Sequence, residues 1–145
     1  MSEVETMKRK YNNSKIEYQG RLFDSKAECE LYQELALKEQ QGMIRNLECQ
    51  PKYTLVPKFR IGGKMQREMT YTPDFQYYDN ELKINRVLDL KGFMQKEARD
   101  RHKLFNYLYL QEFPKGLEVV YKYKGKFVSE SEYKSLRKAK KKGSV

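Results

Sequence analysis

The sequence has little of what most catalytic and structural metal sites require. It contains no tryptophan, two cysteines (Cys29 and Cys49) and one histidine (His102). The cysteines fall in different predicted elements without a paired spacing, so we interpret both as reduced thiols. A single histidine supports neither a Cys/His metal site nor a Ser/His/Asp arrangement. We therefore assign His102 and both thiols no catalytic role.

Long apolar segments are also missing. No run approaches the roughly 18 apolar residues that a membrane span requires, and residues 1–15 contain no apolar segment typical of a secretory signal. These absences predict a cytoplasmic protein without a membrane partner. The glycine pair within residues 61–64, IGGK, lacks the spacing and the following Ser or Thr of a phosphate-binding loop.

Positive charge is abundant. The 145 residues carry a formal net charge of +10, which is typical of a domain that meets a polyanion, either nucleic acid or an anionic membrane surface. The length predicts one domain with a sizeable core. We place this domain at residues 16–135, between a flexible basic arm (1–15) and a flexible basic tail (136–145).

Hydrophobic patterns predict a mixed α/β fold. Residues 16–23 alternate around a Gln-Gly turn and predict a hairpin. Ser25 and Glu28 have the capping-box spacing, which opens a helix that Gly42 ends. The later elements, in order, are strand-like runs at 43–50, 52–60, 65–78 and 82–92, a helix over 95–111, a strand over 117–124 and a short C-terminal helix.

Two aspartates and a lysine occupy the ends of two apolar runs. Alternation along a strand places Asp89 and Lys91 of VLDLK on one face, about 7 Å apart. If the two runs pair through the intervening turn, Asp74 lies beside Asp89. Adjacent carboxylates repel each other, and a hard divalent cation such as Mg²⁺ or Mn²⁺ removes that cost. The alternative is that these groups are solvated strand ends.

A third acid and a row of cations could belong to the same site. Glu28 lies in line with the apolar stripe of the first helix, where it serves the capping box alone or also reaches the two aspartates. The second helix and the tail carry cations that either face solvent or bind phosphates: Lys96, Arg99, Lys103, Arg137, Lys138 and Lys140. The tyrosines of residues 71–78 are interpreted as packing residues.

Taken together, these motifs resemble a known nuclease superfamily. Glu28, then Pro73-Asp74, then Asp89-Leu90-Lys91 are similar to the PD-(D/E)XK pattern, and the order of elements over residues 16–123 is similar to its restriction-endonuclease-like α/β core, a mixed central sheet flanked by helices. The blocks FDSKAE, CQPKYTL, YTPDF and VLDLKG resemble, more narrowly, a family of small phage and prophage proteins grouped with those nucleases.

The resemblance assigns a role to each matching residue. It implies that Asp74, Asp89 and the Leu90 backbone carbonyl bind a catalytic Mg²⁺ or Mn²⁺, and that Glu28 contacts the metal or its waters. Lys91 would orient or activate the attacking water. Gln50 and Lys103 match auxiliary polar residues of some members. Position 89 is Asp rather than Glu, and the pattern allows both.

The implied function is a metal-dependent DNA endonuclease. The phage-family resemblance favours branched DNA, such as Holliday junctions or flaps, and a role in phage replication or recombination in the bacterial cytoplasm. Symmetric cleavage of a four-way junction needs two active sites, which predicts a homodimer. Two alternatives stay open, a noncatalytic DNA-binding or assembly module with a nuclease-like fold and a nuclease that acts on RNA.

Overall fold

The computed structural model describes residues 4–6, 15–90 and 96–143. Its helices are α1 (Lys26–Gln40), α2 (Lys96–Tyr109) and α3 (Glu130–Gly143). Its strands are β1 (Val4–Thr6), β2 (Ile16–Tyr18), β3 (Arg21–Phe23), β4 (Ile44–Cys49), β5 (Tyr53–Val56), β6 (Phe59–Ile61), β7 (Lys64–Gln66), β8 (Met69–Tyr71), β9 (Phe75–Asp79), β10 (Ile84–Leu90), β11 (Leu117–Tyr123) and β12 (Lys126–Ser129).

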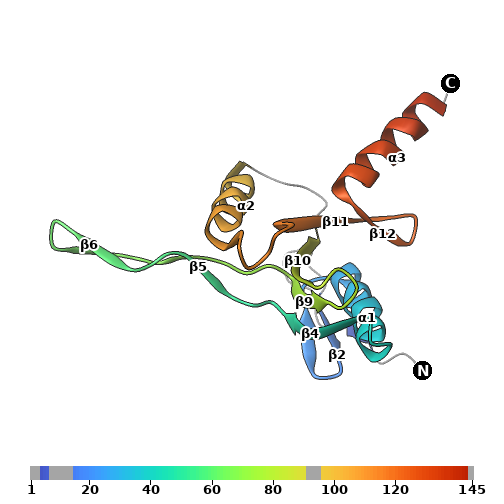
Figure 1. Cartoon of the computed structure of the whole chain (residues 1–145), viewed down its shortest axis with the longest axis horizontal. Helices are drawn as coiled ribbons and strands as arrows, with labels where there is room; N and C mark the ends of the chain where they lie inside the picture. Colours follow the sequence, from blue (N-terminus) through green and yellow to red (C-terminus); the bar gives the residue numbers. More distant parts are fainter. Residues whose placement is uncertain (1–3, 7–14, 91–95, 144–145) are drawn as a thin grey trace.

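A mixed five-stranded sheet, in the order β12-β11-β10-β9-β4, forms the centre of the fold (Figure 1). The predicted α/β class with a mixed central sheet flanked by helices is thereby confirmed. β10 is the central strand. It pairs antiparallel with β9 and parallel with β11, and the chain reaches β11 from β10 through α2. A residue at the end of β10 therefore lies between neighbours on both sides.

Each face of the sheet has its own core. Leu88 packs with Leu31 and Leu35 of α1, whereas the adjacent Val87 packs with Phe105 of α2. Successive side chains of a strand point to opposite faces, so α1 and α2 cover opposite sides of β10. Val87 and Phe105 have no exposed surface, and burial of side chains of this size contributes roughly 1.5–3 kcal/mol each.

The first predicted elements are confirmed. The hairpin is β2–β3, and its turn places Gln19 (φ 50°) and Gly20 (φ 78°) in the left-handed region, which a two-residue turn matched to strand twist requires. Ser25 caps α1, because its Oγ accepts a hydrogen bond from the Glu28 N–H at 3.1 Å. Among the described helices, none combines the length and the apolar character needed to cross a bilayer.

Both ends of the chain contain more regular structure than the sequence predicted. β1 lies in the predicted arm and pairs antiparallel with β2. At the other end, β12 was not predicted, and α3 continues to Gly143 through most of the predicted tail. Tyr133 of α3 stacks on Tyr121 of β11 with ring centroids 4.3 Å apart. This contact holds the helix against the sheet, and the Lys, Arg and Ala residues that follow are good helix formers.

The run predicted as one strand over residues 65–78 is three strands. Pro73 has no N–H to donate to a ladder, and the chain bends there between β8 and β9. β8 pairs with β5, and β7 pairs with β6. Residues 53–71 thus form a two-stranded extension, here called the ribbon, which Figure 1 shows projecting away from the central sheet.

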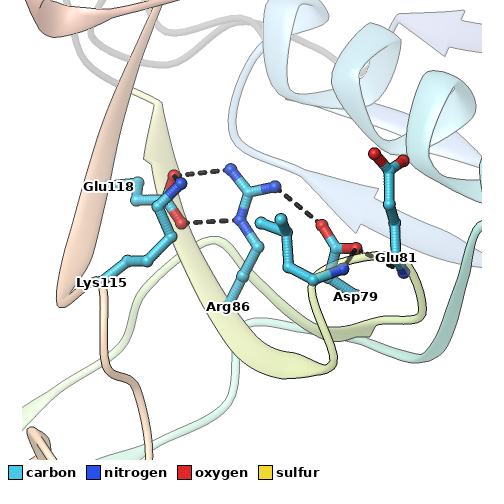
Figure 2. Close-up of polar contacts among 6 residues, drawn as sticks. Asp79, Glu81, Arg86, Lys115 and Glu118 are labelled. Carbon is cyan, nitrogen blue, oxygen red and sulfur yellow. Dashed lines mark hydrogen bonds and ion pairs between the residues drawn. The ribbon is translucent and has the colours of Figure 1, made fainter.

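A network of charged side chains joins β9, β10 and β11 (Figure 2). Arg86 bonds Glu118 through Nε and Nη2, at 2.9 and 2.6 Å, and donates to Asp79 Oδ2 at 3.0 Å. Asp79 Oδ1 accepts from the N–H groups of Glu81 and Leu82, both at 2.9 Å. Burial works to raise the pKa of Asp79, but these bonds outweigh it and hold the pKa below its usual range.

We expect Arg86→Met to lower the free energy of unfolding by about 2 kcal/mol, because it leaves partly buried Asp79 without its cation and Glu118 with the more distant Lys115, at 4.0 Å. Urea denaturation at pH 7 measures this loss. The control is Lys15→Met, since Lys15 pairs with Asp24 at 3.2 Å on the exposed surface and such pairs contribute roughly 0–1 kcal/mol. Equal losses in the two variants would show that the network adds no more than an exposed pair.

Candidate functional site

Three carboxyl groups from three different elements meet at one end of the central sheet. Glu28 comes from the first turn of α1, Asp74 from the bend before β9, and Asp89 from the end of β10. The register that pairs Phe75 with Leu88 places Asp74 across from Asp89. Asp89 is 2% exposed and Glu28 is 4% exposed. The predicted pairing of the two aspartates and the approach of Glu28 are both present.

The backbone holds Asp74 in place from three sides. Its N–H donates to the Leu88 carbonyl at 3.2 Å, and its own carbonyl accepts from the Gln50 N–H at 2.8 Å. Its Oδ2 accepts from the Leu90 N–H at 2.8 Å. Side-chain and main-chain atoms of Asp74 are therefore fixed relative to β10, which leaves the carboxyl little rotational freedom.

Glu28 serves both of the roles that the sequence left open. Its Oε1 accepts from the N–H of Asp24, the residue before the N-cap Ser25, at 3.2 Å, so it helps to hold the start of α1. The same oxygen accepts from Gln50 Nε2 at 3.4 Å, and the carboxyl also hydrogen-bonds Asp74. Burial raises the pKa of Glu28, and these hydrogen bonds only partly counter it. One side chain thus joins the helix cap to the acidic cluster.

The electrostatics of the cluster favour a bound proton or a cation. Burial, the charge of Asp89, the hydrogen bond between these two carboxyls and the charge of Glu28 raise the pKa of Asp74 to about 9. The bond from the Leu90 N–H opposes the shift but is outweighed. Burial and the neighbouring carboxyl charges therefore favour the protonated form of Asp74 when no cation is present.

Gln50 adopts a strained backbone conformation beside the cluster. Its φ of 53° lies in the left-handed region, which few residues other than Gly, Asn and Asp occupy. This conformation lets the residue that follows β4 bond the Asp74 carbonyl through its backbone and Glu28 through its side chain. Strain of this kind is often found at functional sites, and the auxiliary role that the resemblance implies for Gln50 stays a prediction.

Tyr71 and His102 are two site residues that sequence reasoning missed. The Tyr71 hydroxyl donates to Asp89 Oδ2, and His102 Nε2 lies 3.0 Å from that hydroxyl and 3.5 Å from Asp89 Oδ2. Burial and the charge of Asp89 raise the pKa of Tyr71, so the hydroxyl stays a donor. The sequence around His102 offered no partner for its ring, because its partners come from β8 and β10.

A small pocket opens beside the acidic cluster. It has a volume of about 180 Å³, and its lining includes Glu28, Asp74, Gln50, Cys49 and Arg21. Burial raises the pKa of the Cys49 thiol, and the nearby Arg21 opposes this shift. Arg21 comes from β3 and brings a cation to the pocket. Nothing in the sequence around Arg21 predicted that it lines this pocket.

A larger groove lies along α2, and His102 is part of its lining. This basic groove has a volume of about 620 Å³, and its lining includes Arg99, Lys103 and His102 of α2 and Lys134 of α3. Arg99 and Lys103, two of the predicted phosphate-binding residues, thus line the same groove as His102, which contacts Asp89 of the acidic cluster. Lys134 was not predicted.

The remaining predicted residues fall outside this arrangement or outside the described residues. Arg137, Lys138 and Lys140 are exposed on α3. The side chain of Lys96 is not among those the structure describes, and Lys91, the lysine of the sequence pattern, lies outside the described residues. The roles assigned to these residues stay predictions.

The donor set of the cluster suits a hard divalent cation. Asp74 and Asp89 with the Leu90 carbonyl are all oxygen donors, which Mg²⁺ and Mn²⁺ prefer. Within residues 4–6, 15–90 and 96–143, no group of three or more His, Cys, Asp or Glu side chains is arranged to hold a metal ion. The fitting set is therefore two side-chain carboxylates completed by backbone and water oxygens, as Mg²⁺ commonly takes.

A family model for proteins of unknown function, DUF1064, matches residues 8–125. The chain belongs to the DUF1064 family. No curated protein and no solved structure matched the chain. In this DUF1064 protein the matched range contains the acidic cluster, Gln50, Tyr71, His102 and Lys91, whereas the basic residues of α3 lie beyond it. The family description assigns no activity, so function has to be argued from the site.

Proposed function

We propose that this DUF1064 protein is a Mg²⁺- or Mn²⁺-dependent DNA endonuclease with a restriction-endonuclease-like core. The observation that carries the proposal is the convergence of Glu28, Asp74 and Asp89 from three elements at the end of the central strand. The sequence pattern that leads from Pro73-Asp74 to Asp89-Leu90-Lys91 supports the proposal, and its two aspartates lie next to each other on paired strands.

Phosphodiester hydrolysis assigns a task to each of these groups. A bound divalent cation supplies a Lewis acid for the phosphoryl oxygen and lowers the pKa of water. The carboxylates of Asp74 and Asp89 would hold this cation, and the Leu90 carbonyl would add a neutral oxygen ligand. Glu28 and Gln50 orient water at the opening of the small pocket. Lys91, which follows Leu90 directly, would place its ammonium near the attacking water and the phosphate charge.

The basic groove favours a nucleic-acid substrate. Arg99 and Lys103 lie one turn apart on α2, and like charges at this spacing destabilise a helix slightly. Phosphates in the groove turn that repulsion into attraction. Lys134 of α3 adds a third cation to the lining of the groove. His102 lines the groove and contacts Asp89. A nucleic-acid backbone bound in the groove would therefore lie next to the acidic cluster.

Branched DNA is the proposed substrate, and the family resemblance supports a role in phage replication or recombination. A four-way junction has two symmetry-related strands to cut, and we propose that a homodimer supplies the two sites. The test compares labelled four-way junction, flap, single-stranded and linear duplex DNA, with RNA counterparts, in Mg²⁺, Mn²⁺ or EDTA. Metal-dependent cleavage of branched DNA supports the proposal. Binding without cleavage in every metal would point to the noncatalytic alternative.

Tyr71 is proposed to position Asp89. We expect Tyr71→Phe to raise the metal concentration for half-maximal cleavage roughly 10-fold, because outer-shell hydrogen bonds orient metal ligands, while the rate at saturating metal changes less. The control is Tyr53→Phe, which removes another hydroxyl near the same core, one that bonds Gln76 instead. A uniform loss of rate at all metal concentrations in both variants would assign Tyr71 a packing role alone.

A further inference from the structure

The ribbon has a tip of unusual composition, residues 58–67. Four of these ten residues are cations and none is Asp or Glu: Lys58, Arg60, Lys64 and Arg67. Among the strands that the structure describes, β6 and β7, which form the tip, pair with each other alone as a two-stranded sheet. The tip also exposes large apolar side chains, with Ile61 at 63% and Phe59 and Met65 at 48% each.

Charged and apolar groups share each face of the tip. Residues opposite each other in an antiparallel pair point to the same face. The pairs Phe59 with Gln66 and Ile61 with Lys64 therefore form one face, and Arg60 with Met65 belongs to the other. Each face presents an apolar side chain next to a cation. A second copy of this tip would bring like charges together, whereas a polyanion with apolar edges between its phosphates complements both faces.

The root of the ribbon leads directly to the acidic cluster. β8 ends at Tyr71, whose hydroxyl bonds Asp89, while Tyr53 of β5 packs against Phe105 of α2. At about 3.3 Å per residue, the strand from Tyr71 back to the glycine turn covers roughly 25–30 Å. That length is close to one helical turn of B-DNA, about 34 Å.

We propose that the ribbon tip lies in the major groove of the duplex DNA that flanks the scissile phosphate. A two-stranded β-ribbon fits this groove, which is about 12 Å wide. Arg60, Lys64 and their neighbours contact the phosphates on either side, and Phe59 and Ile61 face base edges and thymine methyl groups. The inference rests on the proposed function, which supplies DNA as the substrate. It adds that the enzyme binds a duplex arm next to the scissile phosphate.

The test measures binding without chemistry. Fluorescence anisotropy of full-length protein with labelled duplex and four-way junction DNA in EDTA gives Kd as a function of salt. We expect Arg60→Ser with Lys64→Ser to raise Kd roughly 10-fold or more, and to reduce the slope of log K against log salt by about 2, because each lost phosphate contact removes about 0.9. Phe59→Ser with Ile61→Ser should raise Kd and leave the slope unchanged.

A matched pair of substitutions controls for overall charge. Lys124→Asn with Lys126→Ser removes two cations from the β11–β12 turn, an exposed hairpin away from the ribbon. This pair should leave Kd close to that of the wild type. Equal weakening by the two charge pairs, or no weakening by the ribbon pair, would overturn the inference. All variants should keep the wild-type Tm, since the substituted side chains are exposed.

Sedimentation of the same variants tests the other occupant of this surface. If Phe59→Ser with Ile61→Ser dissociates a dimer and leaves DNA affinity intact, the tip binds a second copy and the inference fails. Because binding is measured on uncut DNA, its outcome is separate from that of the proposed function. If the ribbon variants lose DNA binding and the wild type cleaves no DNA, the inference about the ribbon stands and the proposed nuclease function fails. If the wild type cleaves DNA and the ribbon variants bind it normally, the proposed function stands and the inference about the ribbon fails.

Discussion

Asp89→Asn should lower metal-dependent DNA cleavage by at least about 1,000-fold, equivalent to roughly 4 kcal/mol in the barrier. The substitution keeps the size of the side chain but removes the charge that binds the cation together with Asp74. Asp89 is almost fully buried and accepts a hydrogen bond from the Tyr71 hydroxyl. The amide of Asn at position 89 would therefore also disturb the contact with His102. Cleavage of labelled four-way junction DNA at saturating Mg²⁺ and Mn²⁺ measures the loss.

The control for this variant is Asp100→Asn, which makes the same chemical change at an exposed position of α2. It should cleave at the wild-type rate. DNA binding in EDTA should be equal for Asp89→Asn and the wild type, because the acidic cluster does not attract phosphate by itself. Full activity of Asp89→Asn would show that the site is elsewhere, and a loss of binding would show that the variant is misfolded.

The second large effect concerns stability and pH. The folded-state pKa of Asp74 is about 9, against an ordinary value of 3.8. Between these values the folded protein holds a proton that the unfolded chain has released. This contribution to stability is fully present below the ordinary pKa and is lost as pH rises through the folded pKa, with a slope of up to about 1.4 kcal/mol per pH unit.

Asp74→Asn removes this ionisation and should therefore raise the Tm of the metal-free protein at pH 8. A gain of roughly 1 kcal/mol or more corresponds to about 3 °C or more for a chain of this size. The difference from wild type should shrink towards pH 5, where both side chains are neutral. Added Mg²⁺ should stabilise the wild type at pH 8 and leave Asp74→Asn unchanged, since the variant lacks one of the two carboxylates.

Asp79→Asn provides the opposite control. The pKa of Asp79 lies below its usual range, so its contribution is present above the ordinary pKa and is lost as pH falls through the folded pKa. Asp79→Asn should thus lower Tm at pH 7, and the loss should diminish in acid. Scanning calorimetry from pH 4 to 9 separates the two behaviours. A wild-type Tm equal to that of Asp74→Asn at every pH would show that Asp74 carries no proton.

Much of the acidic cluster could be predicted from the sequence, because local patterns determine it. Alternation in VLDLK fixed the face of Asp89, and the capping-box spacing fixed Glu28 at the start of α1. The turn between β9 and β10 is short, so the two runs had to pair in the register that brings Asp74 to Asp89. In each case the neighbours that decide the position lie within about 16 residues along the chain.

Only the tertiary structure decided which residues surround that cluster. The contact of His102 with Tyr71 and Asp89 joins α2, β8 and β10, and it exists because α2 packs on one face of β10. Local patterns also did not predict the ribbon. Alternation predicts one strand over residues 65–78, whereas in the structure the bend at Pro73 and the pairing of β8 with β5 divide this run. Alternation shows that a segment is extended, but its partner strand is chosen by the packing of the whole fold.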